Sequence, residues 1–577
     1  MTGGLALVLL FGLAGCGPAS PPAPLVAFPL GWPHAAGTKP ASGNSGAVAS
    51  DAKLASEVGA EIMRRGGNAV DAAVATGFAL AVVYPEAGNL GGGGFTVVRM
   101  ADGRVAALDY REVAPLAATR DMFANDTASP SRSVVGPLAS GVPGSVAGLT
   151  DLQRRFGSMP LIRVMTPAIR LAEQGFVVDS QLAASVGRHQ LLIARYAGAS
   201  MLLPNGKPLA VGMVLRQPAL ARTLQAIADS GAAAFYSGEV SRLLAGDLAS
   251  AGSIITAEDL ARYKAEWREP IRATYRGHTL LTMPPPGSGT TLVEILNILE
   301  GFDPLPAFGS VQRAHLFASS MQRAFLDRNA LLGDPAFVRV PVERLTDKSY
   351  AAKLRAAIGA RATPTSGLVA AGGNEGTHTT HYSVVDKAGS AVSTTTTIND
   401  LYGSGVYLPS VGIFMNDEMD DFAARPGQPN VYGLVQGEQN AIAPGKRMLS
   451  SMVPTIVLDR TGKPLLAVGA RGGPRLVTGV LQTIVNVIDH HMTIADAISA
   501  PRMHHQSLPD IIRFERDGLL PRVVDSLRAL GYGVVPWGVG AAYSPDGNLG
   551  SVNGILRSGK RWTAFSDPRT GGRAVAF

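Results

Sequence analysis

Two threonines stand at the outer ends of a predicted β-hairpin, where their hydroxyl groups could support nucleophilic chemistry. Residues 379–385 alternate as a strand, residues 386–389 make a good turn, and residues 391–398 alternate back. Counting outward from the turn places Thr397 roughly opposite Thr379, so both hydroxyls can share one face of the hairpin. Threonine also favours strands for its shape alone. The pattern therefore fits either a pair of reactive hydroxyls or a Thr-rich edge hairpin.

Two other patterns of residues that could do chemistry are interpreted as structural. His490-His491 and His504-His505 are adjacent pairs, and neighbouring residues do not converge easily on one metal ion. The run Gly91–Gly94 lacks both the lysine of a phosphate-binding loop and the glycine spacing of a dinucleotide-binding turn. We therefore expect no metal ion and no cofactor.

A pair of helices is predicted near the start of the folded region. From Asp51, apolar residues recur at helical spacing until Gly66-Gly67 ends this amphipathic helix. Asn68 can cap a second helix over residues 69–83, which is apolar on nearly every side. A helix of that composition should be buried.

The rest of the chain alternates between strand-rich and helix-rich segments. In order, we expect a strand pair (95–99 and 105–110), helical segments (145–265 and 289–331), a soft segment of small and polar residues (362–378), strands from 379 onward and a long apolar helix (477–488). Two sheets with helical blocks before and between them indicate a layered α/β structure. The pattern by itself does not specify the topology.

Length and composition restrict the class of protein. The chain has 577 residues, of which 46% are apolar and 16% charged, enough for one large domain or several smaller ones with a sizeable core. The net charge of +7 is spread over the whole length, without a run of five or more basic residues. A nucleic-acid partner therefore has little support.

The N-terminal residues are those expected of an exported protein. Residues 1–15 contain a short apolar run that suits a signal peptide, and the Leu-Ala-Gly-Cys sequence ending at Cys16 is similar to a bacterial lipoprotein cleavage site. We expect residues 1–15 to be removed and Cys16 to be acylated. The segment 16–45, rich in Pro, Ala, Gly and Ser, would then form a flexible tether.

This interpretation predicts a periplasmic or cell-surface protein that a lipid attaches to a bacterial membrane. The alternative is an ordinary secretory signal with a chance cysteine, and residues 1–15 lack the positive charge that is usual for both kinds of signal. Because Cys16 is the only cysteine, no intramolecular disulfide can form.

A series of short motifs resembles the γ-glutamyltranspeptidase family from about residue 45 to residue 577. Each motif is weak alone, but together and in order they are very specific. They begin with 67–73 (Gly-Asn-Ala-Val-Asp-Ala-Ala), 91–95 (Gly-Gly-Gly-Gly-Phe) and 111–115 (Arg-Glu-Val-Ala-Pro), continue with 379–386 (Thr-Thr-His-Tyr-Ser-Val-Val-Asp), 397–399, 416–422, 429–434 and 449–452, and end with 472–473, 500–506 and 567–569.

The resemblance implies a self-processing enzyme with the αββα four-layer fold of the N-terminal nucleophile hydrolases. The precursor would be cut between His378 and Thr379 into a large subunit (46–378) and a small subunit (379–577). Thr379 would be the nucleophile, and its newly freed α-amine, with a reference pKa of about 7.7–8.0, would be the base. Thr397 would orient the nucleophilic hydroxyl.

The resemblance also implies roles for residues that bind a γ-glutamyl substrate. These residues are Gly472 and Gly473 for the oxyanion; Arg111, Ser450 and Ser451 for the α-carboxylate; Asn399, Glu418 and Asp421 for the α-ammonium; and Tyr432 on a loop that covers the pocket. The expected substrates are glutathione and other γ-glutamyl compounds, with water, amino acids or peptides as acyl acceptors. Alone, the glycine pair would indicate only a turn, and the acidic pair only a solvated loop.

Two segments depart from the usual family pattern. Ala470-Arg471 precedes the glycine pair where the family often has Ser-Pro, and residues 284–289 (Pro-Pro-Pro-Gly-Ser-Gly) differ from the usual Pro-Ser-Ser-Gly-Gly ending. An arginine beside the oxyanion site could alter the preference for substrate or acceptor.

Two alternative functions stay open. Acylases that act on glutaryl-cephalosporin-like amides share the fold and nucleophile, but their substrates lack the α-ammonium that Asn399, Glu418 and Asp421 would bind. The chain could also be an inactive, lipid-anchored binding protein, although it retains Thr379 and Thr397.

Overall fold

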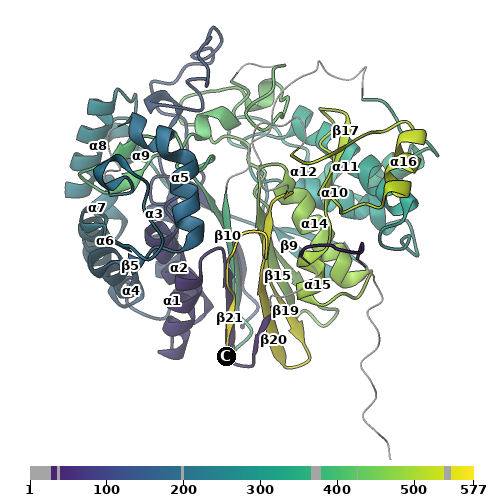
Figure 1. Ribbon diagram of the computed structural model, residues 1–577, viewed down its shortest axis with the longest axis horizontal. Coiled ribbons are helices and arrows are strands. Elements are labelled where there is room, and N and C mark those ends of the chain that lie inside the picture. The colour runs from purple at the N-terminus through teal and green to yellow at the C-terminus, as the bar shows by residue number, and fades with distance from the viewer. Residues whose placement is uncertain (1–27, 35–38, 197–200, 366–378, 425–426, 539–547) are drawn as a thin grey trace, which may run out of the picture.

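Two seven-stranded β-sheets pack face to face in the centre of the computed structural model, and helices cover the outer side of each sheet (Figure 1). The structure describes residues 28–34, 39–196, 201–365, 379–424, 427–538 and 548–577. These four layers form the αββα fold that the sequence predicts.

Neighbouring strands in both central sheets run antiparallel. In spatial order the first sheet consists of β21 (Val575–Ala576), β2 (Gly46–Ser50), β10 (Thr380–Asp386), β11 (Ala391–Thr397), β3 (Gly93–Arg99), β4 (Val105–Asp109) and β7 (Glu266–Arg268). The second sheet consists of β1 (Ala41–Gly43), β20 (Arg561–Ser566), β19 (Ser551–Ser558), β15 (Pro464–Arg471), β14 (Thr455–Leu458), β9 (His278–Thr282) and β8 (Ile271–Tyr275).

The helices form two blocks, one on each side of the paired sheets (Figure 1). The block beside the first sheet contains α1 (Lys53–Arg64), α2 (Ala69–Val83), α3 (Ser145–Phe156), α4 (Leu161–Gln174), α5 (Ser180–Arg195), α6 (Pro218–Ser230), α7 (Ala232–Tyr236), α8 (Glu239–Ala251) and α9 (Ala257–Arg262). The block beside the second sheet contains α10 (Gly289–Glu300), α11 (Val311–Leu331), α12 (Val342–Leu345), α13 (Lys348–Ala356), α14 (Arg475–Ile488), α15 (Ile494–Ser499) and α16 (Pro521–Ala529). Shorter strands pair outside the central sheets: β5 (Phe176–Val177) with β6 (Val214–Leu215), β12 (Tyr407–Leu408) with β13 (Ile413–Phe414), and β17 (Ile511–Phe514) with β16 (Met503–His504) and β18 (Gly533–Pro536).

The first two helices form as the sequence predicts, with one difference at the start of α1. The Asn68 side chain accepts hydrogen bonds from the amides of Val70 and Asp71, and Asp71 bonds back to the Asn68 amide. Every residue of α2 is buried. Helix α1 begins at Lys53, because the Asp51 carboxylate is bonded to strands of both sheets and does not cap the helix.

The predicted helical segment 289–331 is divided into α10 and α11. The ten residues between them include Pro304, Pro306 and Gly309, which interrupt helical hydrogen bonding. The segment 145–265 is likewise a series of shorter helices, α3–α9, joined by turns and by the small pair of strands β5 and β6.

Part of the segment 16–45 is packed into the fold, so the prediction of a flexible tether was wrong for Trp32 and for strand β1. Strand β1 pairs with β20 at the edge of the second sheet. Trp32 is buried, and its Nε1 donates a hydrogen bond to the Ser499 carbonyl (2.7 Å). The Pro, Ala, Gly and Ser composition of this segment predicts no packing. A single tryptophan can nevertheless bury a large apolar area, and Trp32 does so here. Residues 1–27, with Cys16, and residues 35–38 lie outside the described residues.

A buried layer of side chains joins the two sheets, which approach closely at Gly469. At one end of the layer between the sheets, the imidazole of His381 lies against Gly469. Its two ring nitrogens are hydrogen bonded to the hydroxyls of Thr395 and Ser383, each at 2.9 Å. Burial lowers the pKa of His381 to about 3, so the ring is neutral. The rest of this layer consists of Ala47, Ala49, Val97, Val385 and Ala391 of the first sheet and Leu281, Ile456, Leu458, Ala467, Ile555, Trp562 and Ala564 of the second.

Each central sheet contains strands from both sides of Thr379 in the sequence. In the first sheet, β10 and β11 lie between β2 and β3, and in the second, β14 and β19 flank β15 while β9 follows β14. A cut before Thr379 would therefore leave two pieces joined by continuous hydrogen-bond ladders and by one apolar layer.

The contact between Gly469 and His381 predicts that Gly469→Ala displaces the strand that follows Thr379. The added Cβ would lie 2.3 Å from the imidazole ring, and overpacking of this kind costs about 1–3 kcal/mol. We expect a lower melting temperature by circular dichroism. Gly246→Ala in the exposed face of α8 is the control, because its Cβ would meet nothing within 4 Å and alanine stabilises a helix by about 0.5–1 kcal/mol over glycine. Equal melting temperatures for the two variants would contradict the close packing.

Candidate active site

The hairpin β10–β11 brings Thr379 and Thr397 to the same end of the first sheet. Its register pairs Thr380 with Thr396, so the next residues outward, Thr379 and Thr397, face each other as the sequence predicts. Both threonines are buried. The Oγ1 of Thr397 accepts a hydrogen bond from the backbone amide of Asn399 (2.8 Å). Two hydroxyl groups therefore lie together at the buried end of the hairpin.

The carboxylate of Asp51 anchors the strand directly after Thr379. It accepts hydrogen bonds from Thr380 Oγ1 (2.9 Å) and from Asn553 Nδ2 (3.0 Å), and Asn553 also donates to the His381 carbonyl (3.0 Å). The two residues that follow Thr379 are thus tied to both sheets. No local sequence signal indicates this role, because Asp51 is separated by 329 positions from one partner and 502 from the other.

The glycine pair Gly472-Gly473 connects β15 to the first turn of α14. Their φ angles are +130° and +56°, which L side chains rarely adopt, and a Cβ on Gly473 would lie 2.7 Å from the ring of Tyr432. Among the described residues, neither glycine N–H has a hydrogen-bond acceptor. Two unpaired amides before the first turn of a buried helix form a favourable site for an anion.

Facing strands place this glycine pair near Thr379. Val385 and Ala467 lie together in the layer between the sheets, and His381 packs on Gly469. The contact of His381 with Gly469 therefore holds β10 and β15 against each other across the two sheets. Thr379 precedes His381 by two residues and the glycine pair begins three residues after Gly469, so both lie within a few residues of this contact.

Tyr432 joins the glycine pair to the end of the hairpin. Its ring lies against Gly473, and its hydroxyl donates a hydrogen bond to the side-chain carbonyl of Asn399. The Asn399 side chain also donates to the Asp417 carbonyl (3.1 Å). Tyr432, itself buried, therefore spans the space between the two sheets at the end that holds Thr397.

Arg111, which follows β4, is fully buried among three carboxylates. Its Nη1 lies 2.6 Å from Glu418 and 3.2 Å from Glu112, and its Nη2 forms an ion pair with Asp421. Its Nε donates to the Met448 carbonyl (3.4 Å). The structure thus brings Arg111, Glu418 and Asp421 into direct contact, and it adds Glu112, to which the sequence analysis gave no role.

Burial raises the pKa of each of these three carboxyl groups. The pKa values of Glu112, Glu418 and Asp421 are about 7, although the charge of Arg111 acts in the opposite direction on all three. Arg111 alone cannot neutralise three carboxylates. At neutral pH the pocket therefore favours an additional cationic group.

Ser450 and Ser451 lie in the segment that follows Met448, and both are buried. The Oγ of Ser450 accepts a hydrogen bond from the Met452 amide (3.1 Å), and the Oγ of Ser451 accepts one from Arg328 Nη2 (3.1 Å). Within the part of the chain that the structure describes, neither hydroxyl proton has an acceptor. Both hydroxyls are therefore available to donate to a ligand.

Arg471, one of the departures from the family pattern, connects β15 to the end of α2. Its guanidinium is hydrogen bonded to the hydroxyl of Tyr84 and lies 3.9 Å from the carboxylate of Glu86. These partners differ from those of Arg111, so the two arginines belong to separate charged groups.

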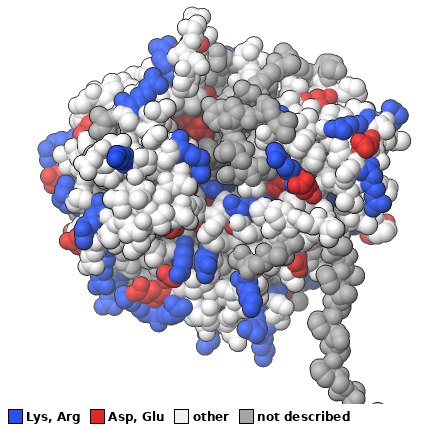
Figure 2. Space-filling model, viewed as in Figure 1, with Lys and Arg blue, Asp and Glu red and all other residues white. Residues whose placement is uncertain are grey.

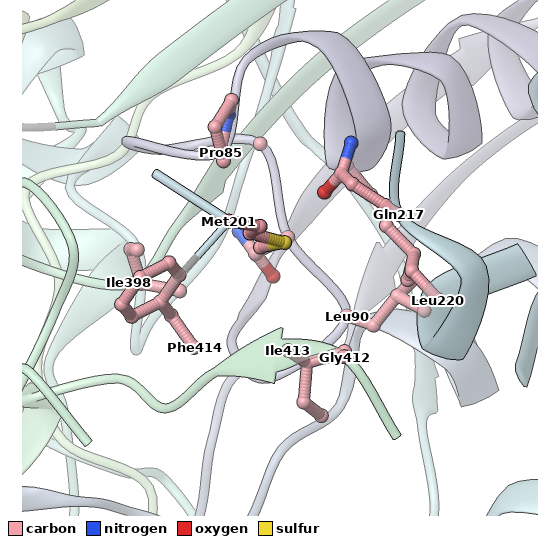
Figure 3. Close-up of a pocket in the computed structure, with 12 residues that line it drawn as sticks. Pro85, Leu90, Met201, Gln217, Leu220, Ile398, Gly412, Ile413 and Phe414 are labelled. Carbon is pink, nitrogen blue, oxygen red and sulfur yellow. The ribbon is translucent and has the colours of Figure 1, made fainter. Parts of the chain in front are cut away.

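A small cavity lies beside Ile398, next to Thr397 in the sequence (Figure 3). Its volume of about 20 Å³ has room for about one water molecule, so it is not a substrate pocket. The residues labelled around it are Pro85, Leu90, Met201, Gln217, Leu220, Ile398, Gly412, Ile413 and Phe414.

Other sequence predictions concern charge, metal ions and membranes. Figure 2 shows Lys and Arg dispersed over one face of the molecule among acidic and uncharged side chains. Among the described residues, no three His, Cys, Asp or Glu side chains are grouped to hold a metal ion. His504 is hydrogen bonded to Thr478 and Gln506. No helix in the described ranges is both long enough and apolar enough to span a bilayer, and His378 lies outside those ranges.

Residues 55–577 match the γ-glutamyltranspeptidase family. The chain belongs to this family. The glutathione hydrolase proenzyme of Escherichia coli K12 is 44% identical to it over 555 residues, which cover 94% of this chain and 95% of that protein. The acylase ACY 1 proenzyme of Pseudomonas sp. SE83 is 40% identical over 557 residues, covering 91% of this chain and 97% of that protein.

A solved structure shares the fold of this chain. The crystal structure of a cephalosporin acylase from Bacillus halodurans aligns with a TM-score of 0.82 at 27% identity, over 98% of this chain and 99% of that chain. The chain is therefore an enzyme of the γ-glutamyltranspeptidase family with the N-terminal nucleophile hydrolase fold.

Removing the charge of Arg111 should destabilise this γ-glutamyltranspeptidase family member most strongly at alkaline pH. Arg111→Met leaves Glu112, Glu418 and Asp421 buried without their cation, and breaking a buried ion pair costs about 3–5 kcal/mol. The folded-state pKa values of these carboxyls are already raised and would rise further in the variant. The protonated groups keep the fold stable at low pH, and that stability is lost as the pH rises through the folded-state pKa.

Urea unfolding of wild type and Arg111→Met at about pH 5.5 and about pH 8 measures this effect, because protonation links stability to pH. We expect the loss in free energy of unfolding to be smaller at the lower pH. The control Arg104→Met removes an exposed arginine paired with Asp102 and should cost less than about 1 kcal/mol at either pH. A loss at Arg111→Met that does not depend on pH would contradict the electrostatic account.

Proposed function

We propose that the protein cuts its own chain before Thr379 and then transfers γ-glutamyl groups from glutathione or other γ-glutamyl amides to water, amino acids or peptides. The observation that carries this proposal is the packing of His381, two residues after Thr379, on Gly469, three residues before Gly472; among the described residues the amides of Gly472 and Gly473 have no acceptor. Acyl transfer needs a nucleophile beside donors that stabilise an oxyanion. Membership of the γ-glutamyltranspeptidase family supports the same chemistry.

Self-cleavage creates the catalytic base. The Thr379 hydroxyl attacks the carbonyl of His378 and forms an ester, which water then hydrolyses. The products are a carboxylate on His378 and a free α-amine on Thr379, with a reference pKa of about 7.7–8.0. The large subunit (46–378) and the small subunit (379–577) stay together because their strands alternate within both sheets.

The acyl transfer follows in two steps. The Thr379 oxygen attacks the γ-glutamyl carbonyl carbon while the α-amine accepts the hydroxyl proton. The amides of Gly472 and Gly473 donate to the oxyanion, which collapses and expels the leaving amine with that proton. Water or an acceptor amine then attacks the γ-glutamyl ester, and the Thr379 hydroxyl is restored. Thr397 orients this hydroxyl from the neighbouring strand.

The charged groups of the pocket complement both charges of a γ-glutamyl substrate. In the proposal, the substrate carboxylate and ammonium enter between Arg111 and its carboxylate partners and replace their direct contacts. Each buried charge then keeps an opposite partner, which avoids the cost of an unpaired ion. The assignment is Arg111, Ser450 and Ser451 for the α-carboxylate; Asn399, Glu418 and Asp421 for the α-ammonium; and Tyr432 as a cover over the pocket.

The acylase alternative is supported by the 40% identity to acylase ACY 1. A glutaryl substrate carries no α-ammonium, so it would leave Glu418 and Asp421 without a new cation. The excess of buried carboxylates around Arg111 therefore favours the γ-glutamyl substrate. A kcat/KM for a glutaryl anilide equal to that for the γ-glutamyl anilide would favour the acylase instead.

The location of the protein is part of the proposal. We propose that the chain is exported, cut before Cys16 and lipid-anchored through that cysteine to a bacterial membrane. The support is the Leu-Ala-Gly-Cys sequence after a short apolar run. Mass spectrometry of the N-terminal peptide from membranes distinguishes an acylated Cys16 from an unmodified one.

Thr379→Ala should remain a single chain and should be inactive. The variant lacks the hydroxyl that both cuts the precursor and attacks the substrate, and loss of a catalytic nucleophile lowers kcat by about 10⁴-fold or more. Intact-mass measurement and a glutathione turnover assay on the same sample test both effects. We expect the wild type to give two chains, the smaller beginning at Thr379.

Thr461→Ala is the matched control, because Thr461 lies in an exposed turn and, within the described part of the chain, its side chain is bonded to Asp459 alone. This variant should be cut and active like the wild type. A folded wild-type chain that stays uncut and does not turn over γ-glutamyl compounds would rule out the proposed function.

A further inference from the structure

Arg328 is a buried arginine that contacts the Ser450–Ser451 segment. It lies on α11 and is 1% exposed. Its Nε donates to Ser288 Oγ (3.0 Å), its Nη2 to Ser451 Oγ (3.1 Å) and its Nη1 to Asn329 Oδ1 (3.2 Å). Among the described residues, no carboxylate forms an ion pair with it.

A buried cation without an acidic partner is costly, because burial removes its hydration. Burial lowers the pKa of Arg328 to about 10, so the group keeps its charge at neutral pH. Asp421 acts on this pKa in the opposite direction and Arg111 in the same direction as burial. Arg328 therefore adds positive potential on the side of the pocket where the serine hydroxyls lie.

Ser288 links Arg328 to the backbone of the serine segment. Its hydroxyl donates to the Ser450 carbonyl (2.6 Å) and accepts from Arg328. The Ser450 amide donates to the Pro286 carbonyl (2.8 Å). The segment 284–289, which departs from the usual family sequence, is thus hydrogen bonded to the backbone of Ser450. Arg328 in turn is hydrogen bonded to Ser288 of that segment.

Arg328 also determines the direction of the Ser451 hydrogen bond. A guanidinium can only donate, so the Ser451 oxygen must accept from it and the hydroxyl proton must point elsewhere. No acceptor for that proton is found in the described ranges. The charge-assisted bond also polarises the hydroxyl, which makes it a stronger donor to an anion.

We propose that Arg328 is a positioning residue for the α-carboxylate of the substrate: it holds Ser451 as a hydrogen-bond donor and places an unpaired positive charge behind it. This inference rests on the proposed function, because the carboxylate is that of the γ-glutamyl group. Arg328 acts through Ser451, whereas Arg111 is proposed to touch the carboxylate itself.

Two anilide substrates test the inference. One is γ-glutamyl-p-nitroanilide, and the other is 4-aminobutanoyl-p-nitroanilide, which has the same scissile bond and amino group but lacks the α-carboxylate. For Arg328→Met we expect KM for the γ-glutamyl anilide to rise about tenfold to hundredfold, as for the loss of a hydrogen bond to a charged group. We expect kcat for this substrate to change less than KM. We expect kcat/KM for the second anilide to stay within about twofold, because that substrate has no carboxylate for Ser451 and Arg328 to act on.

Further variants separate positioning from mere support of the fold. Arg328→Lys keeps the charge and should restore part of the loss. In a double-mutant cycle, Ser451→Ala should add little to Arg328→Met, because both remove one interaction. Arg323→Met is the control and should match the wild type, because Arg323 lies on the same helix but donates to the Ser319 and Ala357 carbonyls and to no residue of the serine segment that the structure describes.

The outcomes distinguish this inference from the proposed function. A wild type that does not hydrolyse the γ-glutamyl anilide overturns the proposed function. If the wild type is active and the folded Arg328→Met variant loses activity equally on both anilides, the inference is overturned. It is also overturned if the variant loses activity on neither. If Arg328→Met does not fold, the same comparison with Arg328→Lys decides, and equal losses on both substrates again overturn it.

Discussion

The packing of the His381 imidazole on Gly469 fixes the position of β10 relative to β15, and the candidate site depends on that position. The ring is neutral and both of its nitrogens are hydrogen bonded, so it places no charge and no unpaired polar atom between the sheets. Glycine is required opposite it, because any side chain would overlap the ring. With this contact fixed, Thr379 of one sheet and the glycine pair after the other reach the same end of the layer. Neither sheet alone contains a complete site.

Buried charge is the second constraint on the molecule. Three carboxylates surround Arg111, and their raised pKa values show that the folded protein holds them at a cost. Arg328, by contrast, is a buried cation whose hydrogen-bond partners among the described residues are all neutral. A ligand with one negative and one positive charge would compensate both excesses. The γ-glutamyl group carries both a carboxylate and an ammonium, whereas a glutaryl group carries only the carboxylate.

Local structure was predictable from the sequence, whereas long-range contacts were not. The Asn68 cap of α2 and the register of the β10–β11 hairpin depend on residues within a few positions of one another, and both were predicted. The bond between Asp51 and Thr380 joins residues 329 apart, and that between Arg328 and Ser451 joins residues 123 apart. The spacing of residues in a single sequence does not predict which residues so far apart will be hydrogen bonded. Family resemblance implied a role for Arg111 but none for Glu112 beside it, and the composition of residues 16–45 gave no sign that Trp32 is buried.

The central claim is that Thr379 acts as the nucleophile with an amine that exists only after cleavage. Its most direct test is to mix the processed protein with a γ-glutamyl anilide, quench with acid within the first turnover and map the modified peptide by mass spectrometry. The account predicts one γ-glutamyl group on the peptide that begins at Thr379, attached as an ester that hydroxylamine removes. A γ-glutamyl group on another residue, or turnover by a chain that is still joined to His378, would contradict it.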